Sequence, residues 1–534
     1  MDLEARLDAL FAVWNRSDAP GVAAGVVWRG AVAYRKAFGM ASLESGVALS
    51  AQTKMRIGST SKHMTALLAL LLAEEGLLDL DAPVRDYLPE LIGAGGDPTL
   101  RMLLQHRGGS RCYVDLGFIA NGMATLPIGE ALASQARQGG GNFAPGEAMI
   151  YNNGGYHLVS LAIERTGGAP FEQQMKIRLF DRIGLSDTAS IPSDRVITPG
   201  MATLHLAEPD GGWRRGLFPT EELRGEGGVV STVDDMIRWM RHLRARDRFG
   251  SRETWEALIE RPRFSDGALG AYGLGMTHGQ YRGVATRHHA GGVVGGSCQM
   301  IQFPQHDLDI VILSNGAPGA NPVTLARGVA DILLGDQLAS SPPLVAASAY
   351  GDRVGQWWSP KTGMLYGLID DAGELKLSVC GAPTGLPLSP QGDDGPVCSS
   401  SGLGDIVVDL GATRADGLLS IRFGGETHDH VRLTPAVETP AIEASAVGAY
   451  VCADADCSAV VEVAAGSLQV GFRGRYGGWT AELRPLGRGV AVAVGDQAGD
   501  PFPIALSFDA NGGGFNLNGV RTRALRFDRR DTER

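Results

Sequence analysis

Ile57-Gly58-Ser59-Thr60-Ser61-Lys62 opens an apolar helical stretch that continues through His63-Met64-Thr65-Ala66-Leu67-Leu68. Ser59 and Lys62 are three residues apart, so a helix places both side chains on one face, one turn from each other. The free N–H groups and the positive dipole end of a helix start favour a developing negative charge at Ser59. A serine hydroxyl becomes a nucleophile when a base takes its proton, and a desolvated lysine can be that base, whereas arginine cannot.

Lysine is scarce in this chain, which makes the pattern more specific. The chain contains 42 Arg and only 6 Lys, and of these only Lys62 has a serine three residues before it. The alternative interpretation is an ordinary helix start with a serine cap and an exposed lysine, because such short patterns recur by accident. The spacing by itself leaves both interpretations open.

The length, charge and apolar runs of the chain exclude several classes of protein. The 534 residues provide room for about three domains, and the 75 glycines indicate many turns. A net charge of -11 without a basic run argues against nucleic-acid binding. The acidic start Met1–Leu7 lacks the basic residues and apolar core of a signal peptide, so we expect none, and the longest apolar run, Ala66–Ala73, is too short to cross a membrane. We therefore expect a cytoplasmic protein without a nucleic-acid or membrane partner.

Cysteines and histidines give no pattern typical of a metal or cofactor site, and we expect neither. The six cysteines (112, 298, 380, 398, 452 and 457) are scattered, so free thiols are expected, with Cys452 and Cys457 close enough to leave a disulfide open. His428-Asp429-His430 has no further ligand cluster nearby, and an exposed strand or turn is the stronger interpretation.

The first two thirds of the chain mix helices and strands. Residues 3–15, the stretch after Ser59, and residues 100–104, 156–165, 233–243 and 323–334 are predicted to be helices, with Thr232 and Asp235 forming a cap. Residues 22–28, 31–38, 292–303 and 308–314 are predicted to be strands. Because the strands come from both ends of the region and the helices lie between them in the sequence, we expect helices that flank one sheet, an α+β sandwich.

After residues 339–343, helical periodicity gives way to short alternating strands. Val354-Gly355-Gln356-Trp357 matches Val447-Gly448-Ala449-Tyr450, and Gly373–Leu377 matches Gly466–Val470, both at an offset of 93. Asp416 and Asp509 are separated by the same offset. We expect a duplicated unit forming two small antiparallel β-barrels. The predicted domains are 1–338, 345–435 and 443–534.

A second chemical element is Tyr151-Asn152-Asn153-Gly154, in a loop just before a helix. A phenol beside a lysine ammonium is expected to have a lowered pKa and to shuttle protons. Asn153 can hydrogen-bond a substrate amide or the lysine. The alternative is a tyrosine at a loop–helix junction with an asparagine cap.

A third element is His289-Ala290-Gly291, which enters a strand. Small residues at a strand edge let a substrate backbone lie alongside, and N–H groups at Gly291 and Gly292 can join that of Ser59 as an oxyanion hole. The alternative is a polar loop before a core strand. Lys361-Thr362-Gly363 resembles a catalytic triplet but lies between two predicted tail strands, and we interpret it as a hairpin turn.

Ser59-x-x-Lys62, Tyr151-x-Asn153 and His289-x-Gly291, in this order, resemble the penicillin-recognising serine hydrolases, which include class C β-lactamases, DD-peptidases and related esterases. The D-aminopeptidases of this group are the closer likeness, because the paired tails and Gly295-Gly296-Ser297-Cys298-Gln299 match as well. The pattern departs at Ala290, where that family has glycine, which leaves the fine specificity open.

The resemblance implies a β-lactamase/DD-peptidase-like catalytic domain and two β-barrels. It implies that Ser59 is acylated, that Lys62 and Tyr151 transfer protons, that Asn153 orients them or the substrate amide, and that His289 lines the substrate strand. It also implies that a loop of the last domain, here 495–501, meets the substrate's free amine through Asp500 or Asp496. An exposed hairpin is the alternative for both aspartates.

The implied substrate is a short peptide or amide with a free N-terminal D-amino acid. Alternatives with the same residues are an esterase, a D-amino-acid amidase or a DD-carboxypeptidase, and a further one is a non-catalytic penicillin-binding or sensor protein. The choice between Lys62 and Tyr151 as general base, and assembly as a homodimer, stay open.

Overall fold

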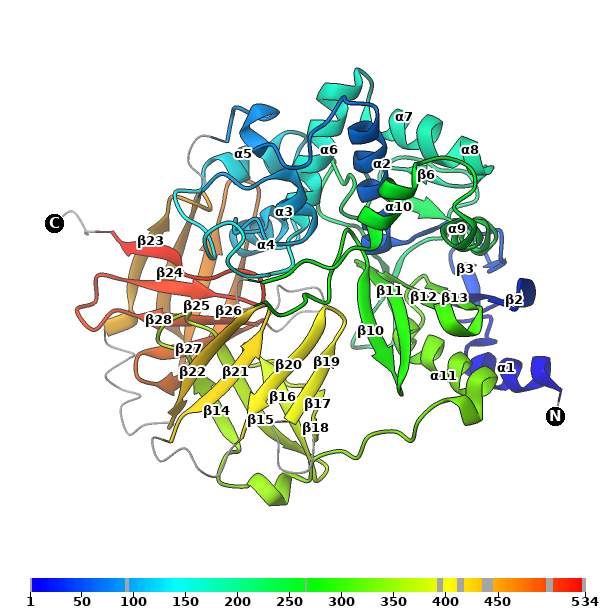
Figure 1. Ribbon diagram of the computed structural model, residues 1–534. Helices are drawn as coiled ribbons and strands as arrows, with labels where there is room; N and C mark the ends of the chain where they lie inside the picture. The colour runs from blue at the N-terminus through cyan, green and yellow to red at the C-terminus, as the bar shows by residue number, and fades with distance from the viewer. Residues whose placement is uncertain are drawn as a thin grey trace.

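The chain forms an α/β sandwich followed by two all-β regions (Figure 1). The computed structural model describes residues 2–91, 96–264, 267–390, 397–410, 417–434, 445–495 and 503–530. The predicted boundaries 1–338, 345–435 and 443–534 stay a prediction, although each of the three major sheets lies within one of these ranges.

The sandwich is built on a six-stranded antiparallel sheet whose strand order is β10-β11-β12-β13-β1-β2. The strands are β1 (Val22–Trp28), β2 (Ala31–Phe38), β10 (Thr277–Tyr281), β11 (Val284–Val293), β12 (Gly296–Phe303) and β13 (Leu308–Ser314). β1 lies between β2 and β13, with Val22 opposite both Phe38 and Ser314. The sequence thus predicted β1, β2 and β13 correctly.

The predicted strand 292–303 is wrong in its first part, because the chain turns within it. β11 continues to Val293, and β12 begins at Gly296 after a tight turn. Gly295 has a φ of +80°, which glycine adopts at little cost and which reverses the chain there. His289 and Gly291 therefore lie on β11 rather than in a loop before a strand.

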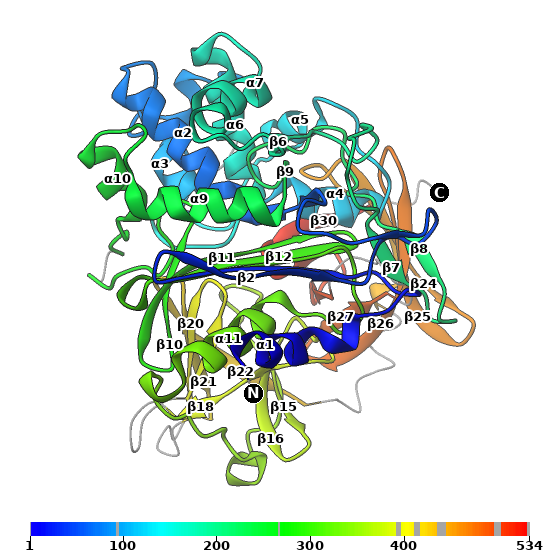
Figure 2. The ribbon, with the colours of Figure 1, turned by 90° about the vertical axis from the view of Figure 1, so that its right-hand side faces the viewer.

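Two layers of helices cover the sheet (Figure 2). On one face lie α2 (Lys62–Glu74), α9 (Val233–Ala245) and α10 (Arg252–Ile259); on the other lie α1 (Leu3–Phe11) and α11 (Pro322–Leu334). Strand β1 shows why both faces are covered. Ala23 and Val27 belong to the hydrophobic core on the side of α2 and α9. Val22, Ala24 and Val26 belong to the core on the side of α1 and α11. This alternation follows from the two-residue period of a strand.

Shorter elements complete the helical side and its edge. The helices are α3 (Leu100–Leu104), α4 (Tyr113–Asn121), α5 (Glu130–Ala136), α6 (Asn153–Gly167), α7 (Phe171–Met175) and α8 (Asp181–Ile183). The strands are β3 (Met40–Ser42), β4 (Val47–Ala48), β5 (Met55–Arg56), β6 (Ala189–Ser190), β7 (His205–Ala207), β8 (Trp213–Arg215) and β9 (Val229–Ser231). The predicted cap of α9 is present, since Thr232 Oγ1 accepts from the Asp235 N–H at 3.1 Å.

The next region is a nine-stranded antiparallel sheet. Its strands are β14 (Gly355–Trp358), β15 (Leu365–Asp371), β16 (Glu374–Val379), β17 (Leu386–Pro387), β18 (Ser389–Pro390), β19 (Val397–Ser401), β20 (Gly404–Asp409), β21 (Leu419–Phe423) and β22 (Glu426–Leu433). The order runs from β17 through β14 and β22 to β18, so within the described residues this sheet is a half-barrel rather than the expected closed barrel.

The last region is a closed eight-stranded barrel, as predicted. Its strands are β23 (Gly448–Cys452), β24 (Cys457–Ala464), β25 (Ser467–Arg473), β26 (Gly478–Gly487), β27 (Val490–Val494), β28 (Ile504–Phe508), β29 (Gly514–Asn518) and β30 (Leu525–Arg529). β23 pairs with β30 and closes the ring. Closure leaves no unpaired strand edge.

The two all-β regions repeat one pattern at the predicted offset. Trp357 on β14 donates to the Arg353 carbonyl at 2.9 Å, and Tyr450 on β23 donates to the Ala446 carbonyl at 2.6 Å. The turns Ala372-Gly373 and Ala465-Gly466 both have positive φ. Asp416, the third predicted match, lies outside the described residues.

The remaining sequence motifs have structural positions. Lys361-Thr362-Gly363 forms the turn between β14 and β15, where the Gly363 N–H donates to the Ser359 carbonyl at 2.8 Å. His428-Asp429-His430 lies in β22, but His430 is buried rather than exposed. Cys452 and Cys457 face each other across the β23–β24 hairpin as free thiols.

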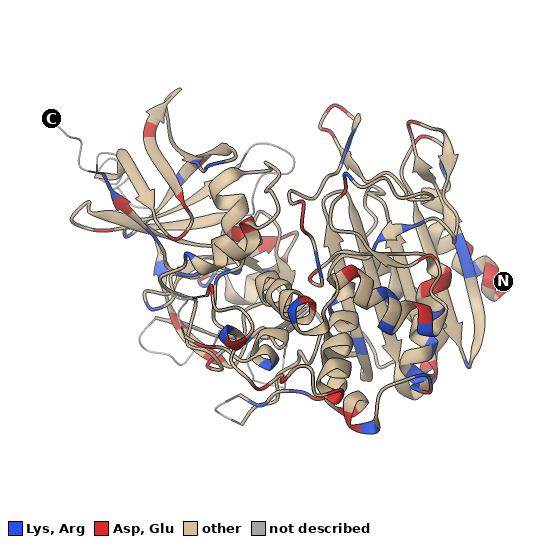
Figure 3. Ribbon diagram, turned by 90° about the horizontal axis from the view of Figure 1, so that it is seen from above, with Lys and Arg blue, Asp and Glu red and all other residues tan. Residues whose placement is uncertain are grey.

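Charged groups are distributed over the whole molecule. Acidic and basic residues are interspersed along all three regions (Figure 3). Across the described part of the chain, we find no helix that combines the length and the apolar character needed to cross a membrane.

Candidate active site

Ser59 and Lys62 lie at the junction of a 3₁₀ turn, Gly58–Ser61, with helix α2. The Lys62 Nζ is 3.0 Å from the Ser59 Oγ, as the three-residue spacing predicts. It also donates to the Asn153 Oδ1 at 2.7 Å and to the Glu226 carbonyl at 2.6 Å. The interpretation as an exposed lysine is wrong, because Lys62 is 0 % exposed.

Burial sets the charge state of Lys62. Desolvation is the largest effect and lowers the pKa of Lys62 to about 7, whereas the Glu226 carboxylate acts in the opposite direction. A lysine with a pKa near neutrality exchanges its proton under ordinary conditions, as a general base must.

Tyr151 lies beside this pair, in the segment that leads into α6. Its ring centroid is 4.7 Å from the Lys62 Nζ. Its hydroxyl is buried beside Ser59 and forms no hydrogen bond with another described residue. Burial is the largest effect and raises the pKa of Tyr151, while Ser59 only partly lowers it. The expected fall in the pKa of Tyr151 is therefore wrong, because desolvation outweighs nearby charge.

Aromatic and histidine rings pack against the ring of Tyr151. The His106 ring centroid is 4.2 Å from that of Tyr151, and the His106 Nδ1 accepts from the Asn152 N–H at 3.1 Å. Tyr272 also packs against His106, with ring centroids 4.4 Å apart, and its hydroxyl is 2.9 Å from the His289 Nε2. Burial holds the pKa of His289 well below its usual value, so the ring is neutral. Sequence analysis missed His106 and Tyr272, for which no motif provides a signal.

The strand β11 passes directly against the serine turn. Thr60 Oγ1 donates to the His289 carbonyl at 3.2 Å. A Cβ atom on Gly291 would lie 1.9 Å from the Ile57 carbonyl oxygen and 3.2 Å from the Ser59 nitrogen. Only glycine permits this approach, which brings the backbones of β11 and Ser59 together as the oxyanion hypothesis requires.

A buried acidic network lies behind Lys62. The Tyr113 hydroxyl donates to the Glu226 Oε1 at 2.6 Å, and the His157 Nδ1 is 3.2 Å from the same oxygen. Burial alone would raise the pKa of Glu226, but His157 and Tyr113 outweigh it and lower that pKa. Sequence analysis missed Glu226, although an acidic residue among glycines in Gly225-Glu226-Gly227-Gly228 is an unusual signal.

The aspartates predicted to meet the substrate amine cannot be placed. Asp496 and Asp500 lie outside the described residues. Of the described part of the terminal barrel, Gly519–Ala524, between β29 and β30, contacts the sandwich near the site. From it the Arg521 guanidinium pairs with Asp115 at the start of α4.

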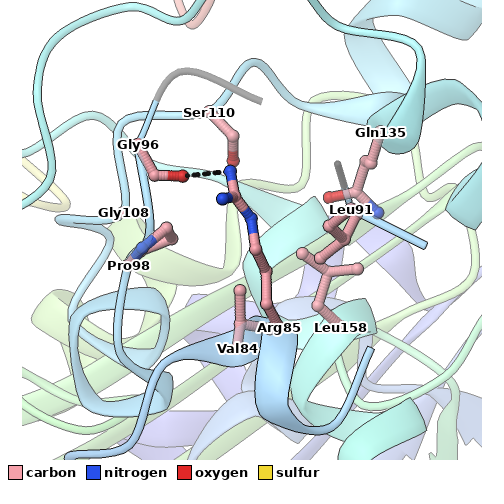
Figure 4. Close-up of a pocket in the computed structure, with 9 residues that line it drawn as sticks. All are labelled: Val84, Arg85, Leu91, Gly96, Pro98, Gly108, Ser110, Gln135 and Leu158. Atoms are coloured by element: carbon pink, nitrogen blue, oxygen red, sulfur yellow. Dashed lines mark hydrogen bonds between the residues drawn. The ribbon is translucent and has the colours of Figure 1, made fainter. Parts of the chain in front are cut away.

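A small hollow lies between the segment 84–110 and the helices α5 and α6 (Figure 4). Its wall is formed by Val84, Arg85, Leu91, Gly96, Pro98, Gly108, Ser110, Gln135 and Leu158, without Ser59, Lys62 or Tyr151. Ser110, in the wall of the hollow, also contacts the segment that carries Tyr151, because its carbonyl accepts a hydrogen bond from the Asn152 Nδ2 at 2.7 Å. Within the described residues, no group of three His, Cys, Asp or Glu side chains is arranged to hold a metal.

An α/β sandwich with a buried lysine beside a serine at a helix start is the architecture of β-lactamase-like and DD-peptidase-like serine hydrolases. A family model described as Beta-lactamase matches residues 4–334. The chain belongs to the beta-lactamase family.

Relatives extend the likeness to the whole chain. A D-aminopeptidase of Cereibacter sphaeroides (strain KD131 / KCTC 12085) is 28% identical over 534 residues, covering 98% of this chain and 97% of that protein. A D-aminopeptidase of Brucella canis is 27% identical over 364 residues, 66% of each chain.

Solved structures show the same fold. The octameric penicillin-binding protein homologue from Pyrococcus abyssi has a TM-score of 0.56 at 21% identity, covering 80% of this chain and 100% of that one. A D-stereospecific amidohydrolase from Streptomyces sp. has a TM-score of 0.51 at 19% identity, covering 62% of this chain and 99% of that one.

Proposed function

We propose that this serine hydrolase releases small N-terminal D-amino acids from short peptides, amides or esters through an acyl-enzyme on Ser59. The proposal is supported by the full-length likeness to D-aminopeptidases and by the grouping of Ser59, Lys62 and Tyr151. Asn153, His289 and Gly291, also predicted from the sequence, lie around the same group.

The observation that carries the mechanism is the set of partners around the Lys62 amine. Two of its three partners, the Glu226 carbonyl and the Asn153 Oδ1, are oxygens that only accept hydrogen bonds. A neutral amine has two N–H groups and one lone pair. If the N–H groups bind these oxygens, the lone pair is directed at the Ser59 hydroxyl. This arrangement supports Lys62 as the general base.

The reaction then proceeds in two balanced steps. The Ser59 Oγ attacks the carbonyl carbon while its proton passes to Lys62, and the oxyanion is held by backbone N–H groups of Ser59 and β11. The C–N bond breaks as the leaving amine takes a proton, and an ester to Ser59 remains. Water then attacks this ester and gives a proton to Lys62, the bond between the acyl carbon and the Ser59 Oγ breaks, and Lys62 returns the proton to that oxygen as the amino acid leaves.

Tyr151 is suited to donate a proton rather than to accept one. Burial raises the pKa of Tyr151, so it stays a phenol at neutral pH and is a donor rather than a resting base. We propose that it passes a proton to the leaving amine, with Lys62 restoring it. His289 stays a proposed catalytic residue, and its neutral ring lines the substrate strand.

The decisive experiment compares Ser59→Ala with the matched variant Lys361→Ala. Release of D-alanine from D-alanine amide should be lost in Ser59→Ala and unchanged in Lys361→Ala, because Lys361 belongs to the β14–β15 turn and not to the group around Ser59. Mass spectrometry should find a trapped D-alanyl adduct on the Ser59 peptide of the unmodified protein. Full activity of Ser59→Ala would end the assignment.

Substrate choice distinguishes the related activities. We expect faster turnover of D-alanine amide and D-alanyl peptides than of their L-forms. Preference for p-nitrophenyl esters would indicate an esterase, amides without peptides a D-amino-acid amidase, and C-terminal D-alanine release a DD-carboxypeptidase. A stable β-lactam adduct without turnover would indicate a sensor.

Amine recognition by Asp500 or Asp496 stays a prediction. Asp500→Asn should raise the KM for D-alanyl substrates more than it changes kcat, because binding of a cationic amine is lost. Asp496→Asn provides the matched comparison. Unchanged KM in both variants would show that neither aspartate binds the amine.

A further inference from the structure

One short segment, Ser110–Asp115, connects the active site with the terminal barrel. It lies between the two, immediately before and within the first turn of α4. Its side chains divide between two directions. Arg111 and Asp115 contact the barrel, whereas Ser110 and Tyr113 contact Asn152 and Glu226, which adjoin the group around Ser59.

On the barrel side, the contacts are numerous and polar. Arg111 donates to the Arg523 carbonyl at 2.9 Å, to the Ala524 carbonyl at 3.0 Å and to the Asp454 carboxylate at 2.9 Å. The Arg521 guanidinium forms a two-pronged pair with Asp115 at 2.5 and 3.1 Å. Such two-pronged pairs fix orientation as well as distance.

On the side of the active site, two hydrogen bonds connect the segment to residues next to Lys62 and Tyr151. The Ser110 carbonyl binds Asn152, which lies between Tyr151 and Asn153. Tyr113 binds the carboxylate of Glu226, whose carbonyl accepts from the Lys62 amine. One partner of the amine, Glu226, is therefore contacted directly from this segment, and the other, Asn153, is reached through its neighbour Asn152.

Burial makes this chain of contacts rigid. Arg111, Tyr113 and Glu226 are at most 4 % exposed, and the side chains of Arg521 and Asp115 are 18 and 13 % exposed. Removing one partner of such a contact leaves a buried polar group unpaired, and water cannot easily replace it. Moving the barrel away would thus displace the segment.

We propose that Ser110–Asp115 is a positioning element through which the terminal barrel, by Arg521, holds Lys62 and the Tyr151–Asn153 loop in their working geometry. The barrel is then a part of the catalytic unit, in addition to any role in limiting substrate size. Arg521 acts through Asp115 and is a positioning residue, not a catalytic one. This inference rests on the proposed function, since it concerns the same serine and lysine.

The charge of Arg521 adds a second effect at the same place. The titratable groups that interact with Lys62 are Glu226, Cys112, Arg521, Tyr151, Tyr156, His106 and His289. Among them Arg521 lowers the pKa of Lys62, and it also lowers the pKa of Tyr151. Loss of this positive charge should make Lys62 hold its proton to higher pH.

The test uses the full-length protein and the rate at which a fluorophosphonate labels Ser59, measured against pH. Arg521→Gln should reduce the labelling rate at pH 7 about 10–100-fold, since displaced catalytic groups lose this much. The acid limb of its profile should move to higher pH. The matched control is Arg526→Gln, which breaks an ion pair with Asp509 inside the same barrel and should leave rate and profile unchanged.

Two more variants separate positioning from charge and from folding. Arg521→Lys keeps the charge but loses the two-pronged geometry, so it should slow labelling without moving the profile. Tyr113→Phe keeps the ring but removes the hydroxyl bound to Glu226, so it should slow labelling with the barrel fully docked and folded.

The outcomes distinguish the two hypotheses. Absence of Ser59 labelling in the unmodified protein would contradict the proposed function itself. Normal labelling, with rate and pH profile unchanged in Arg521→Gln and Tyr113→Phe, would overturn the positioning role alone. Should Arg521→Gln fail to fold, Arg521→Lys and Tyr113→Phe still decide.

Discussion

The half-barrel β14–β22 and the closed barrel β23–β30 share an opening strand, a first turn and a closing arginine. Arg432 on β22 donates to the Asp352 and Val354 carbonyls, and Arg529 on β30 donates to the Ser445 and Val447 carbonyls. In both regions, an arginine of the last strand thereby hydrogen-bonds the backbone of the segment that precedes the first strand. The offset of 93 residues in the sequence thus reflects two copies of one structural plan.

The copies differ in how their last hairpin meets the sandwich. In the half-barrel this hairpin is the tight turn Gly424-Gly425, and the Met149 N–H donates to the Gly424 carbonyl at 2.9 Å. In the barrel it is the longer loop Gly519–Ala524, which reaches Asn142 and α4 through Arg521 and its backbone. Arg523 of the long loop pairs with Glu426 of the short hairpin at 2.8 Å.

The difference between the two hairpins indicates how one copy of a duplicated unit can gain a role that the other lacks. The two hairpins lie on the same stretch of the sandwich, 142–149, just before Tyr151. The short one contacts it through backbone and apolar groups, whereas the long one also brings the Arg521 guanidinium to Asp115 of the sandwich. We therefore expect the long loop to act on both position and protonation at the site.

The largest expected effect comes from truncating the equivalent core aromatics. Trp357→Ala and Tyr450→Ala should each cost about 3–5 kcal/mol of stability in their own region, because both side chains are buried at the opening strand. Calorimetry should show one lowered transition in each variant. Activity below that transition should fall further in Tyr450→Ala, and equal losses in the two folded variants would contradict the difference between the copies.

The next effect is the pH dependence of kcat/KM. Lys62 must be neutral to accept a proton, and its pKa is about 7, so activity should rise with pH through this value. Below it, the rate should fall about tenfold per pH unit. A pH–rate profile with D-alanine amide measures this. A flat profile between pH 5 and pH 8 would exclude Lys62 as the base.

The closing arginines should show an intermediate effect. Arg432→Gln and Arg529→Gln each remove charge-assisted hydrogen bonds to backbone carbonyls at the surface and should cost about 1–2 kcal/mol. Denaturant unfolding followed by tryptophan fluorescence measures both. Loss of stability in only one of the two variants would show that the shared plan is not used equally.

The smallest effect is expected for the apolar contact of the half-barrel. Phe423 packs against Met149, Phe264 and Tyr272, the cluster that also contacts Tyr151. Phe423→Leu conserves most of the volume and should cost less than about 1.5 kcal/mol. We expect kcat within about twofold and an unmoved pH profile, since no charge is altered. A shifted profile would show that the half-barrel, too, controls protonation.

The sequence predicted those parts of the fold that rest on local patterns. Ser59 and Lys62 could be paired because three residues on a helix start fix their distance, and β1 and β2 follow from alternation around Arg29-Gly30. The duplication was visible because matching turns need matching glycines.

Features that depend on burial and on distant contacts could not be predicted in the same way. Glu226, Tyr113 and Arg521 come together from three separate parts of the chain, and no spacing relates them. The pKa of Tyr151 moves against expectation because desolvation is a property of the packed state. The resemblance to D-aminopeptidases pointed to the loop 495–501, of which 496–501 lie outside the described residues, whereas the loop 519–524, which no motif marks, makes described contacts near the site.

The central position of β1 has a consequence for synthesis on the ribosome. One edge of this strand can pair with β2 at once, but its other edge pairs with β13, whose Ser314 lies opposite Val22. Nearly the whole sandwich must leave the ribosome before its sheet closes, and such long-range pairing is slow. The nascent chain thus carries an open apolar strand while α2 to α10 emerge, so chaperones should engage this protein before its last sheet strand is made.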